Sequence, residues 1–419
     1  MRRGRPHPEG PPVTARRTAV LTLGVAVALI AGATLGNGGA NLMPLFIDDF
    51  SARFGLGDSG AGLVGAAQLM ATAVVTLRLA GRAARPGRVR MTRTGLAVAG
   101  AGFVGATAAS DLPTLILANL VIGAGLGAVY AAATAAIAAT DDADKASAVT
   151  IAGTVVVTAL LIMAVPAANH SLGEGTGFLV MALWCLLAWP LVRGLPDGPA
   201  TATPTAPGTG AGATPEAEGP TTTATPSWVL LGAIALLWAV TQGAWAYASV
   251  FGREHAGMSA SAVSVVLAVS GVVALVGAAL GPVAARRFGR TRSLAGFIVA
   301  QALSMAVLVL TRDPVLFVVA AVLWQACQLA VLVQTLAAAA LLDPSGRLVA
   351  SLSGASALGT GIGPLAVGAV LDTAGAGVLG VLLALGTLVA SVPPLRMTVA
   401  SATADRARRP EPARAAPTR

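Results

Sequence analysis

The loop at residues 84–90 reads ARPGRVR, and a second loop at residues 286–292 reads RRFGRTR. Each contains the pattern G-R-x-R, which begins at Gly87 in the first loop and at Gly289 in the second. The two patterns are 202 residues apart in a chain of 419 residues. A repeat at half the chain length indicates two copies of one structural unit, provided that other loops share the offset.

Other turn-like segments do share this offset. Residues 55–59 read GLGDS and residues 257–261 read GMSAS, and Asp141 lies 202 residues before Asp343. Independent loops agree on one offset only if the segments between them have equal lengths. We therefore predict two halves with the same fold and the same connections.

The composition excludes a soluble globular protein. Apolar residues make up 55% of the chain and charged residues only 11%, whereas a soluble domain carries about 25% charged residues. Apolar runs of 18 or more residues recur along the chain, and each is long enough to cross a bilayer of about 30 Å as a helix. The sequence predicts an all-α integral membrane protein.

We predict twelve spans arranged as two parallel six-helix bundles. Their ranges are 19–47, 60–80, 92–110, 113–139, 146–169, 175–193, 227–251, 259–285, 293–311, 314–342, 348–371 and 375–396. The predicted divisions are an N-terminal tail (1–18), a first bundle (19–193), a linker (194–226), a second bundle (227–396) and a C-terminal tail (397–419). The linker holds seven prolines and nine threonines, a composition typical of a disordered tether, and we expect the C-terminal tail to be disordered too.

The basic residues predict the orientation. If both termini are cytoplasmic, the cytoplasmic loops and tails contain 24 of the 27 Lys and Arg residues. Positive charge collects on the cytoplasmic side of membrane proteins, so this orientation is expected in the plasma membrane. It also explains the net charge of +9 without a nucleic-acid partner.

The two arginine-rich loops resemble the D-R-x-G-R-[RK]-[RK] signature that follows spans 2 and 8 in the major facilitator superfamily. With twelve spans, a central linker and the repeat, the resemblance covers residues 19 to 396. It implies a secondary transporter in which two bundles rock about a central cavity. The Asp of the signature is replaced by Ala84 in the first copy and by Arg286 in the second.

The resemblance also implies a cytoplasmic gate. We expect Arg88 to pair with the acidic group that ends span 4, and Arg290 to pair with Asp343, when the cytoplasmic side is closed. The alternative is that these charges only set the topology and solvate the loops. The residues of the predicted gate are Arg85, Gly87, Arg88, Arg90, Asp141, Asp142, Arg286, Arg287, Gly289, Arg290, Arg292 and Asp343.

Polar side chains recur at helical spacing in the spans that line the cavity in this family, which are spans 1, 4, 7 and 10. They either contact substrate or hydrogen-bond between helices, since polar groups at bilayer depth need partners. The candidate substrate-binding residues, with one from span 2, are Asn37, Asn41, Gln68, Asn119, Tyr130, Trp238, Gln242, Trp245, Gln325 and Gln328.

Charged side chains are absent from the middle of every predicted span. A neutral or weakly polar substrate fits such a cavity better than a charged one, because no buried counter-charge is available. Asp48 and Asp49, at the outer end of span 1, are the candidate proton-coupling residues. The alternatives are that these acids are only solvated and the protein works as a uniporter, or that hydroxyl and amide groups suffice for coupling.

These features favour a secondary transporter of a small molecule, and by family analogy an exporter. An uptake permease is the alternative, and a transporter-like sensor or assembly protein is the alternative from another class. No His, Cys or acidic cluster marks an enzyme or a metal site, and no ATP-binding loop is present. We expect no cofactor, no metal and a monomer in the lipid bilayer. The sequence does not indicate the substrate or the coupling ion.

Overall fold

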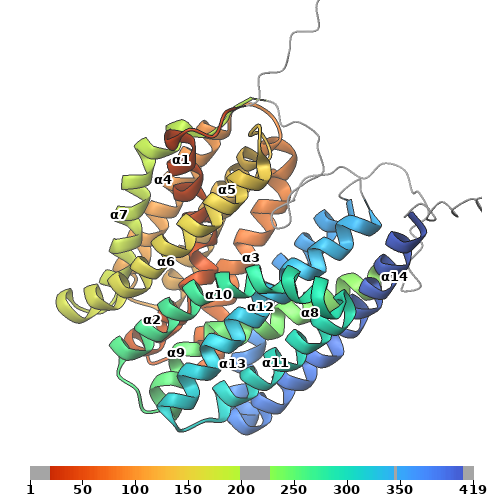
Figure 1. Ribbon diagram of the computed structural model, residues 1–419. Coiled ribbons are helices and arrows are strands. Elements are labelled where there is room, and N and C mark those ends of the chain that lie inside the picture. The colour runs from red at the N-terminus through yellow and green to blue at the C-terminus, as the bar shows by residue number, and fades with distance from the viewer. Residues whose placement is uncertain (1–18, 199–226, 344–346, 409–419) are drawn as a thin grey trace, which may run out of the picture.

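The computed structural model describes residues 19–198, 227–343 and 347–408, and these residues fold almost entirely into helices (Figure 1). Within these ranges β-structure is limited to one isolated bridge between Ala19 and Thr140. The helices of the first half are α1 (Leu23–Asn41), α2 (Met43–Phe54), α3 (Asp58–Ala83), α4 (Arg88–Ala108), α5 (Leu112–Ile137), α6 (Ala143–Leu172), α7 (Thr176–Leu191) and the short η1 (Val192–Gly194).

The second half repeats this order. Its helices are α8 (Ser227–Ala246), α9 (Ala248–Val250), η2 (Phe251–His255), α10 (Ala260–Phe288), α11 (Arg290–Leu310), α12 (Pro314–Leu342), α13 (Arg347–Ala390) and α14 (Val392–Arg408). The backbone of α13 is non-helical at Gly375, where two helices join across a kink. In Figure 1 the two halves form separate bundles, with α2 and α9 where they meet.

The offset of 202 residues is present in the helix boundaries. Helices α10, α11 and α12 begin 202 residues after α3, α4 and α5. The turns repeat as well, because a positive φ is readily adopted only by glycine and the sequence supplies glycine at both copies. The pairs are Gly55 and Gly257 (φ 59° and 65°), Gly87 and Gly289 (109° and 85°), and Gly173 and Gly375 (107° and 76°).

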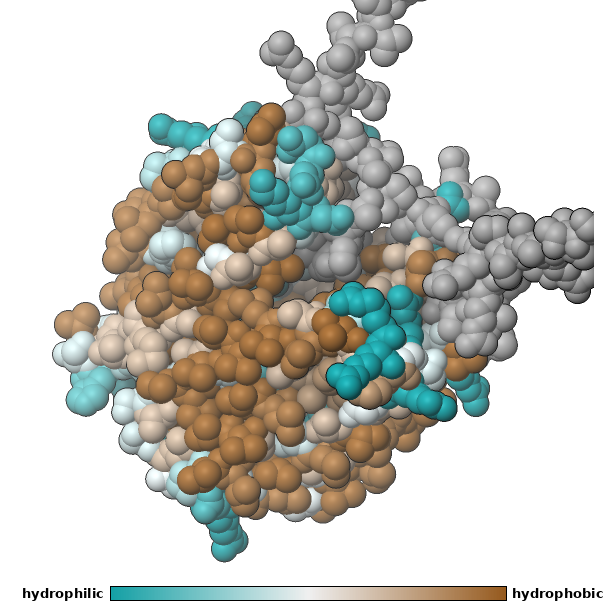
Figure 2. Space-filling view, in the orientation of Figure 1, coloured by the Kyte–Doolittle hydropathy of each residue, from teal (hydrophilic) through white to brown (hydrophobic). Residues whose placement is uncertain are grey.

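The helices expose apolar side chains on their outer faces. Leu117, Leu160 and Leu186 are each more than 60% exposed, and apolar residues cover the middle of the face shown in Figure 2. Such a surface is stable in lipid rather than in water. Ten helices of the described chain are long and apolar enough to cross a membrane, counting α13 with α14 once and omitting α4. The fold is therefore an all-α membrane fold, and the count of twelve spans stays a prediction.

The two halves pack mainly through α3 against α13 and α6 against α10. The first contact is close because small residues meet the partner backbone. A Cβ atom placed on Gly62 would lie 2.5 Å from the carbonyl oxygen of Pro364, so only glycine allows this approach. Small residues at such crossings are typical of helix packing in membranes.

The helix boundaries differ from the predicted ones in three places. The first predicted span is divided at Leu42, because Pro44 at the start of α2 has no N–H to continue the helix. Residues 194–198, at the start of the predicted linker, are described and pack against the first half. Helix α14 continues to Arg408, past the predicted end of the bundle at residue 396. The remaining residues of the predicted linker and tails lie outside the described ranges.

Candidate functional site

The halves are joined by hydrogen bonds at one end of the bundles. The carboxylate of Asp372 in α13 accepts hydrogen bonds from the backbone amides of Ser59 (2.7 Å) and Asp58 (3.2 Å) in α3. The N-cap position of α3 is Gly57, which has no side chain to fill this role. The second half therefore supplies the cap of a helix in the first half. We call the end of the bundles at which Asp372 meets the start of α3 the sealed end.

A tyrosine adds a second contact at the sealed end. The hydroxyl of Tyr247 donates a hydrogen bond of 2.5 Å to the carbonyl oxygen of Asp58, and its side chain is fully buried. The ring lies against that of Phe251 in a tilted arrangement, with the ring centroids 6.4 Å apart. The cap and the tyrosine together fix the start of α3 against the second half.

Asp48 forms an ion pair between the two halves. Its carboxylate accepts a hydrogen bond from the Ser249 hydroxyl and lies 3.2 Å from Nη1 of Arg253. It lies in α2, beyond the apolar span Leu23–Asn41. Burial raises the pKa of Asp48 above its usual value, although Ser249 and Arg253 oppose the shift. A carboxyl group in this setting takes up a proton more readily than one in water.

Asp49 serves the first half instead. Its carboxylate accepts hydrogen bonds from Nδ2 of Asn169 (3.1 Å) and the amide of Gly175 (2.9 Å), and it lies 3.4 Å from Arg53. Burial raises the pKa of Asp49 as well. All of these partners belong to the first half, so of the two predicted proton-coupling residues Asp48 is the one that contacts both halves.

Trp245 also links the halves. Its indole N–H donates to the carbonyl oxygen of Asn41 at 3.2 Å. This oxygen is available because the helix breaks at Leu42, where the amide of Leu45 bonds to Leu42 instead. Trp245 packs against the buried Trp324 with ring centroids 6.0 Å apart. Two of the predicted substrate-binding residues, Asn41 and Trp245, thus lie in the contact between the halves.

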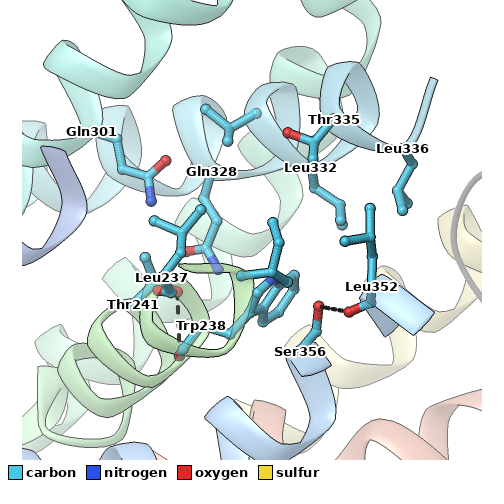
Figure 3. Close-up of a pocket in the computed structure, with 12 residues that line it drawn as sticks. Leu237, Trp238, Thr241, Gln301, Gln328, Leu332, Thr335, Leu336, Leu352 and Ser356 are labelled. Atoms are coloured by element: carbon cyan, nitrogen blue, oxygen red, sulfur yellow. Dashed lines mark hydrogen bonds between the residues drawn. The ribbon is translucent and has the colours of Figure 1, made fainter. Parts of the chain in front are cut away.

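A pocket in the second half collects polar side chains from four helices (Figure 3). Trp238 comes from α8 and Gln328 from α12, as the sequence predicted for cavity-lining spans. Gln301 from α11 faces the same space. The Oε1 atoms of both glutamines are buried and have no hydrogen-bond partner among the described residues. The pocket measures about 30 Å³, enough for a water or one substrate group rather than a whole small molecule.

Further hydroxyl groups line the same pocket. Thr241 and Ser356 each donate to a carbonyl of their own helix, whereas the hydroxyl of Thr335 is buried without a partner among the described residues. No charged side chain lines this pocket. Its unpartnered oxygen atoms can accept hydrogen bonds from a neutral polar group.

The predicted residues of the first half are not among those that line the pocket of Figure 3. Gln68 is fully buried, and both of its amide atoms are unpartnered among the described residues. Asn119 and Asn37 donate to carbonyl groups of their own helices, those of Leu115 and Ala33. Tyr130 packs against α1 at Gly36, where an added Cβ would clash with it. Asn37, Asn119 and Tyr130 thus make contacts within the first half, and a role of these residues and of Gln68 in substrate binding stays a prediction.

Gln242 in α8 and Gln325 in α12 are half-buried. Neither makes a hydrogen bond to another described residue. Their amide groups remain open to a ligand, but the structure does not bring them into the pocket of Figure 3.

The first arginine-rich loop is an ordered structure in its own right. Arg88 is 1% exposed, and its guanidinium group donates to the carbonyl oxygens of Ala83 (2.7 Å), Pro196 (2.9 Å) and Gly198 (2.7 Å). The Asp197 carboxylate accepts the amides of Gly87 and Arg88, each at 2.6 Å. The predicted pair of Arg88 with Asp141 or Asp142 is therefore absent from this conformation, because Arg88 holds residues 196–198, which follow η1, to the start of α4.

The acidic residues of the predicted gate act as caps here. Asp142 accepts the amide of Lys145 at the start of α6, and Asp343 accepts the amide of Leu348 at the start of α13. Nη1 of Arg290 is buried without a hydrogen-bond partner among the described residues. Its pairing with Asp343 stays a prediction for the state closed at this end. The other arginines of the predicted gate are exposed: Arg85, Arg90, Arg286, Arg287 and Arg292.

Sequence reasoning missed Gln301, Tyr247, Arg253 and Asp372. Gln301 stands alone in a span that does not line the cavity in the family, and Asp372 reads as an ordinary loop acid. Their positions follow from contacts between distant segments, which carry no local signal. Within the described residues no group of three His, Cys, Asp or Glu side chains could hold a metal ion.

The structure of this chain is similar to the solved structures of several transporters. The chain is similar to the nucleoside transporter NupG (TM-score 0.69, 12% identity, 91% of this chain and 100% of that one). It is similar to the peptide transporter POT (TM-score 0.68, 13% identity, 91% and 97%). It also resembles a bacterial homologue of the human lysosomal transporter Spinster (TM-score 0.59, 17% identity, 91% and 95%). At these identities the likeness shows the fold alone.

No curated protein sequence matches the chain. Residues 25–345 match the family model described as the Major Facilitator Superfamily, which is well over half of the chain. The predicted family and fold class are confirmed. With its all-helical membrane fold and its two repeated bundles, the chain belongs to the major facilitator superfamily of secondary transporters.

Proposed function

We propose that this protein moves a small neutral or weakly polar molecule across the plasma membrane by alternating access, in the direction of export. One observation carries the proposal. All hydrogen bonds that join the two halves among the described residues lie at the sealed end, between residues 41–59 and residues 245–253 or 368–372. A transporter that opens alternately must break one such set of contacts while it forms another.

The arginine-rich end supports the same mechanism. The loops of the two halves bond within their own half there, as the contacts of Arg88 and Asp142 exemplify. We infer that this end is cytoplasmic, as the distribution of basic residues predicts. The conformation is then open toward the cytoplasm, and the gate pairs of Arg88 and Arg290 would form in the opposite state.

The substrate class follows from the pocket of Figure 3. Gln301, Gln328 and Thr335 present unpartnered oxygen atoms beside the ring of Trp238, and no charge lines the space. A buried polar atom without a partner is costly, so a ligand that donates hydrogen bonds is stabilised there. We propose that one polar group of the substrate enters this pocket while the aromatic ring packs against its apolar part.

We propose that the coupling ion is a proton and that Asp48 binds it. It bridges the halves through Ser249 and Arg253, so its proton affinity depends on whether the sealed end is closed. Proton-coupled transport requires such a dependence. We expect the protein to work as a monomer, because the central cavity of this fold is formed by the two halves of one chain.

The test combines binding and flux. Thermal stabilisation of the purified full chain is measured across a panel of neutral metabolites and drugs, followed by transport of each hit in proteoliposomes. Gln328→Ala and Trp238→Ala are expected to weaken the apparent affinity about three- to tenfold, the effect of one lost hydrogen bond or aromatic contact. Leu323→Ala, on the lipid-facing side of α12, is the matched control and should bind normally.

Two outcomes would contradict this assignment. Unchanged affinity in both pocket variants would remove the pocket from the substrate pathway. Binding without flux for every hit would favour a sensor that has lost transport, which the replacement of the signature Asp by Ala84 also favours.

A further inference from the structure

A second pocket lies at the arginine-rich end, outside the contact between the halves. It is formed by the start of α4, the end of α7 and Asp197, and it measures about 550 Å³. This volume falls within the range of roughly 300–1,000 Å³ that is typical of small-molecule sites. Its charged and aromatic lining consists of Arg90, Arg93, Trp189 and Asp197.

Arg93 is the unexplained group in this pocket. Its Nε and Nη2 atoms are buried and have no hydrogen-bond partner among the described residues. Its guanidinium carbon lies 5.9 Å from the ring centroid of Trp189, a cation–π contact that compensates only part of the lost hydration. A guanidinium group with five donors is best satisfied by an oxyanion, which it can bind through two parallel hydrogen bonds.

The pocket has a net positive charge. Arg90 and Arg93 face a single carboxylate, that of Asp197, whose Oδ1 atom already accepts the amides of Gly87 and Arg88. One negative charge therefore fits the pocket. The remaining carboxylate oxygen can accept a hydrogen bond from a hydroxyl or amine beside that charge.

The helices that carry the pocket have lipid-facing apolar surfaces. Val98 and Val104 on α4 and Leu183 and Leu187 on α7 are each 36–54% exposed. They continue away from the arginine-rich end toward the middle of the bilayer. A ligand with a charged head and apolar tails would match both the arginine pocket and the apolar surface beside it. A free anion would match only the pocket.

The second half lacks two of the side chains that line this pocket. The offset of 202 residues takes Arg90 to Arg292, but it takes Arg93 to Ala295 and Trp189 to Ser391. Since the backbone repeats and these side chains do not, the helix geometry alone does not require an arginine and a tryptophan here. The corresponding position in the second half, which has Arg292 but neither the second arginine nor the tryptophan, therefore serves as an internal control.

We propose that Arg90, Arg93 and Trp189 bind the phosphate headgroup of an anionic phospholipid from the cytoplasmic leaflet. The phosphodiester oxygens accept hydrogen bonds from Arg93, and Arg90 adds a second positive charge. Headgroup hydroxyls donate to Asp197, and the acyl chains lie along α4 and α7. Because Asp197 also caps α4, the lipid stabilises the loop that precedes this helix.

The experiment compares lipids on the full chain in detergent. Native mass spectrometry counts bound lipid, and the midpoint of thermal unfolding is followed, with phosphatidylglycerol, phosphatidylethanolamine or phosphatidylcholine added. Phosphatidylglycerol is expected to bind most tightly. Arg93→Gln should weaken it about fivefold, the equivalent of about 1 kcal/mol for one basic residue near an anionic lipid. Arg292→Gln is the matched control and should retain wild-type affinity.

Other outcomes overturn the proposal. Equal binding of phosphatidylglycerol to the wild type and to Arg93→Gln would show that Arg93 only extends toward the aqueous interface. Equal binding of the three lipids would show that headgroup charge is not recognised. Stabilisation by glycerol phosphate as strong as that by phosphatidylglycerol would assign the pocket to a water-borne anion. If Arg93→Gln does not fold, Arg90→Gln provides the same comparison with a smaller expected loss.

Discussion

The carboxylate of Asp372 lies 2.7 Å from the backbone nitrogen of Ser59, although the two residues are 313 positions apart and belong to different halves. This contact caps α3 from the opposite bundle. If the halves move as we propose, the cap is lost when the sealed end opens, and its free energy stabilises the closed state.

Asp372→Ala is expected to shift the protein toward the state open at the sealed end. Loss of a cap costs about 1 kcal/mol, which changes the ratio of the two states about fivefold. Distances between spin labels on α3 and α13 measure this ratio in proteoliposomes. Asp111→Ala is the control, because Asp111 caps α5 from its own half through the amide of Thr114. An equal shift in both variants would mean that general destabilisation is responsible.

Trp245→Phe is expected to weaken the same state without removing the aromatic packing on Trp324. The change deletes the indole N–H and leaves the carbonyl oxygen of Asn41 without its partner across the halves. The loss of one hydrogen bond predicts a shift of about 1 kcal/mol. Distances between spin labels at the sealed end would measure this shift. Trp228→Phe, at an exposed position far from this end, should leave the label distances unchanged.

The balance between the states should also depend on pH through Asp48. Burial raises the pKa of Asp48 while the sealed end is closed, and opening exposes the carboxyl to water and returns the pKa toward its usual value. The closed end thus binds the proton more tightly. Its extra stability is complete below the usual Asp pKa and is lost as the pH rises through the raised pKa.

Acidification should accordingly favour closure of the sealed end in the wild type. The groups that face Asp48 are Ser249, Arg253 and Glu254, so the titration is read against Asp48→Asn, which keeps the shape and cannot ionise. The label distances of this variant should not change with pH over the same range. A titration that persists in Asp48→Asn would belong to another group, and Asp48 would lose its proposed role.

The repeat and the membrane-embedded helices could be predicted because they depend on residues that are close together in the sequence. Glycine at Gly87 and Gly289 supplies the positive φ before α4 and α11, so the repeat was visible in the loops themselves. Apolar composition likewise determines burial in a membrane. The break at Leu42 had a local signal too, because Pro44 cannot continue α1, but the length of the apolar run concealed it.

The candidate site was less predictable because it depends on contacts between segments that are distant in sequence. Gln301 joins Gln328 only after α11 and α12 pack side by side. The sequence could place Trp245 on a cavity-facing stripe, but not show that its N–H bonds to α1. Arg88 was recognised as a motif residue, whereas its partners in residues 196–198 lie in a segment whose composition predicts disorder.

The contacts of Arg88 with residues 196–198 indicate which part of the predicted linker can be shortened. Residues 196–198 hold Arg88 and cap α4, whereas the rest of the predicted linker lies outside the described ranges. Removal of ten residues within 204–220 is expected to leave transport and thermal stability intact, because the remaining length of the predicted linker is enough to span the bundles. Asp197→Ala should lower the stability by about 1 kcal/mol, since two backbone amides at the start of α4 lose their acceptor. Glu216→Ala, in the same predicted linker, is the matched control and should behave as wild type. If the shortened linker abolishes transport while membrane insertion and thermal stability survive, the linker has a role beyond that of a tether.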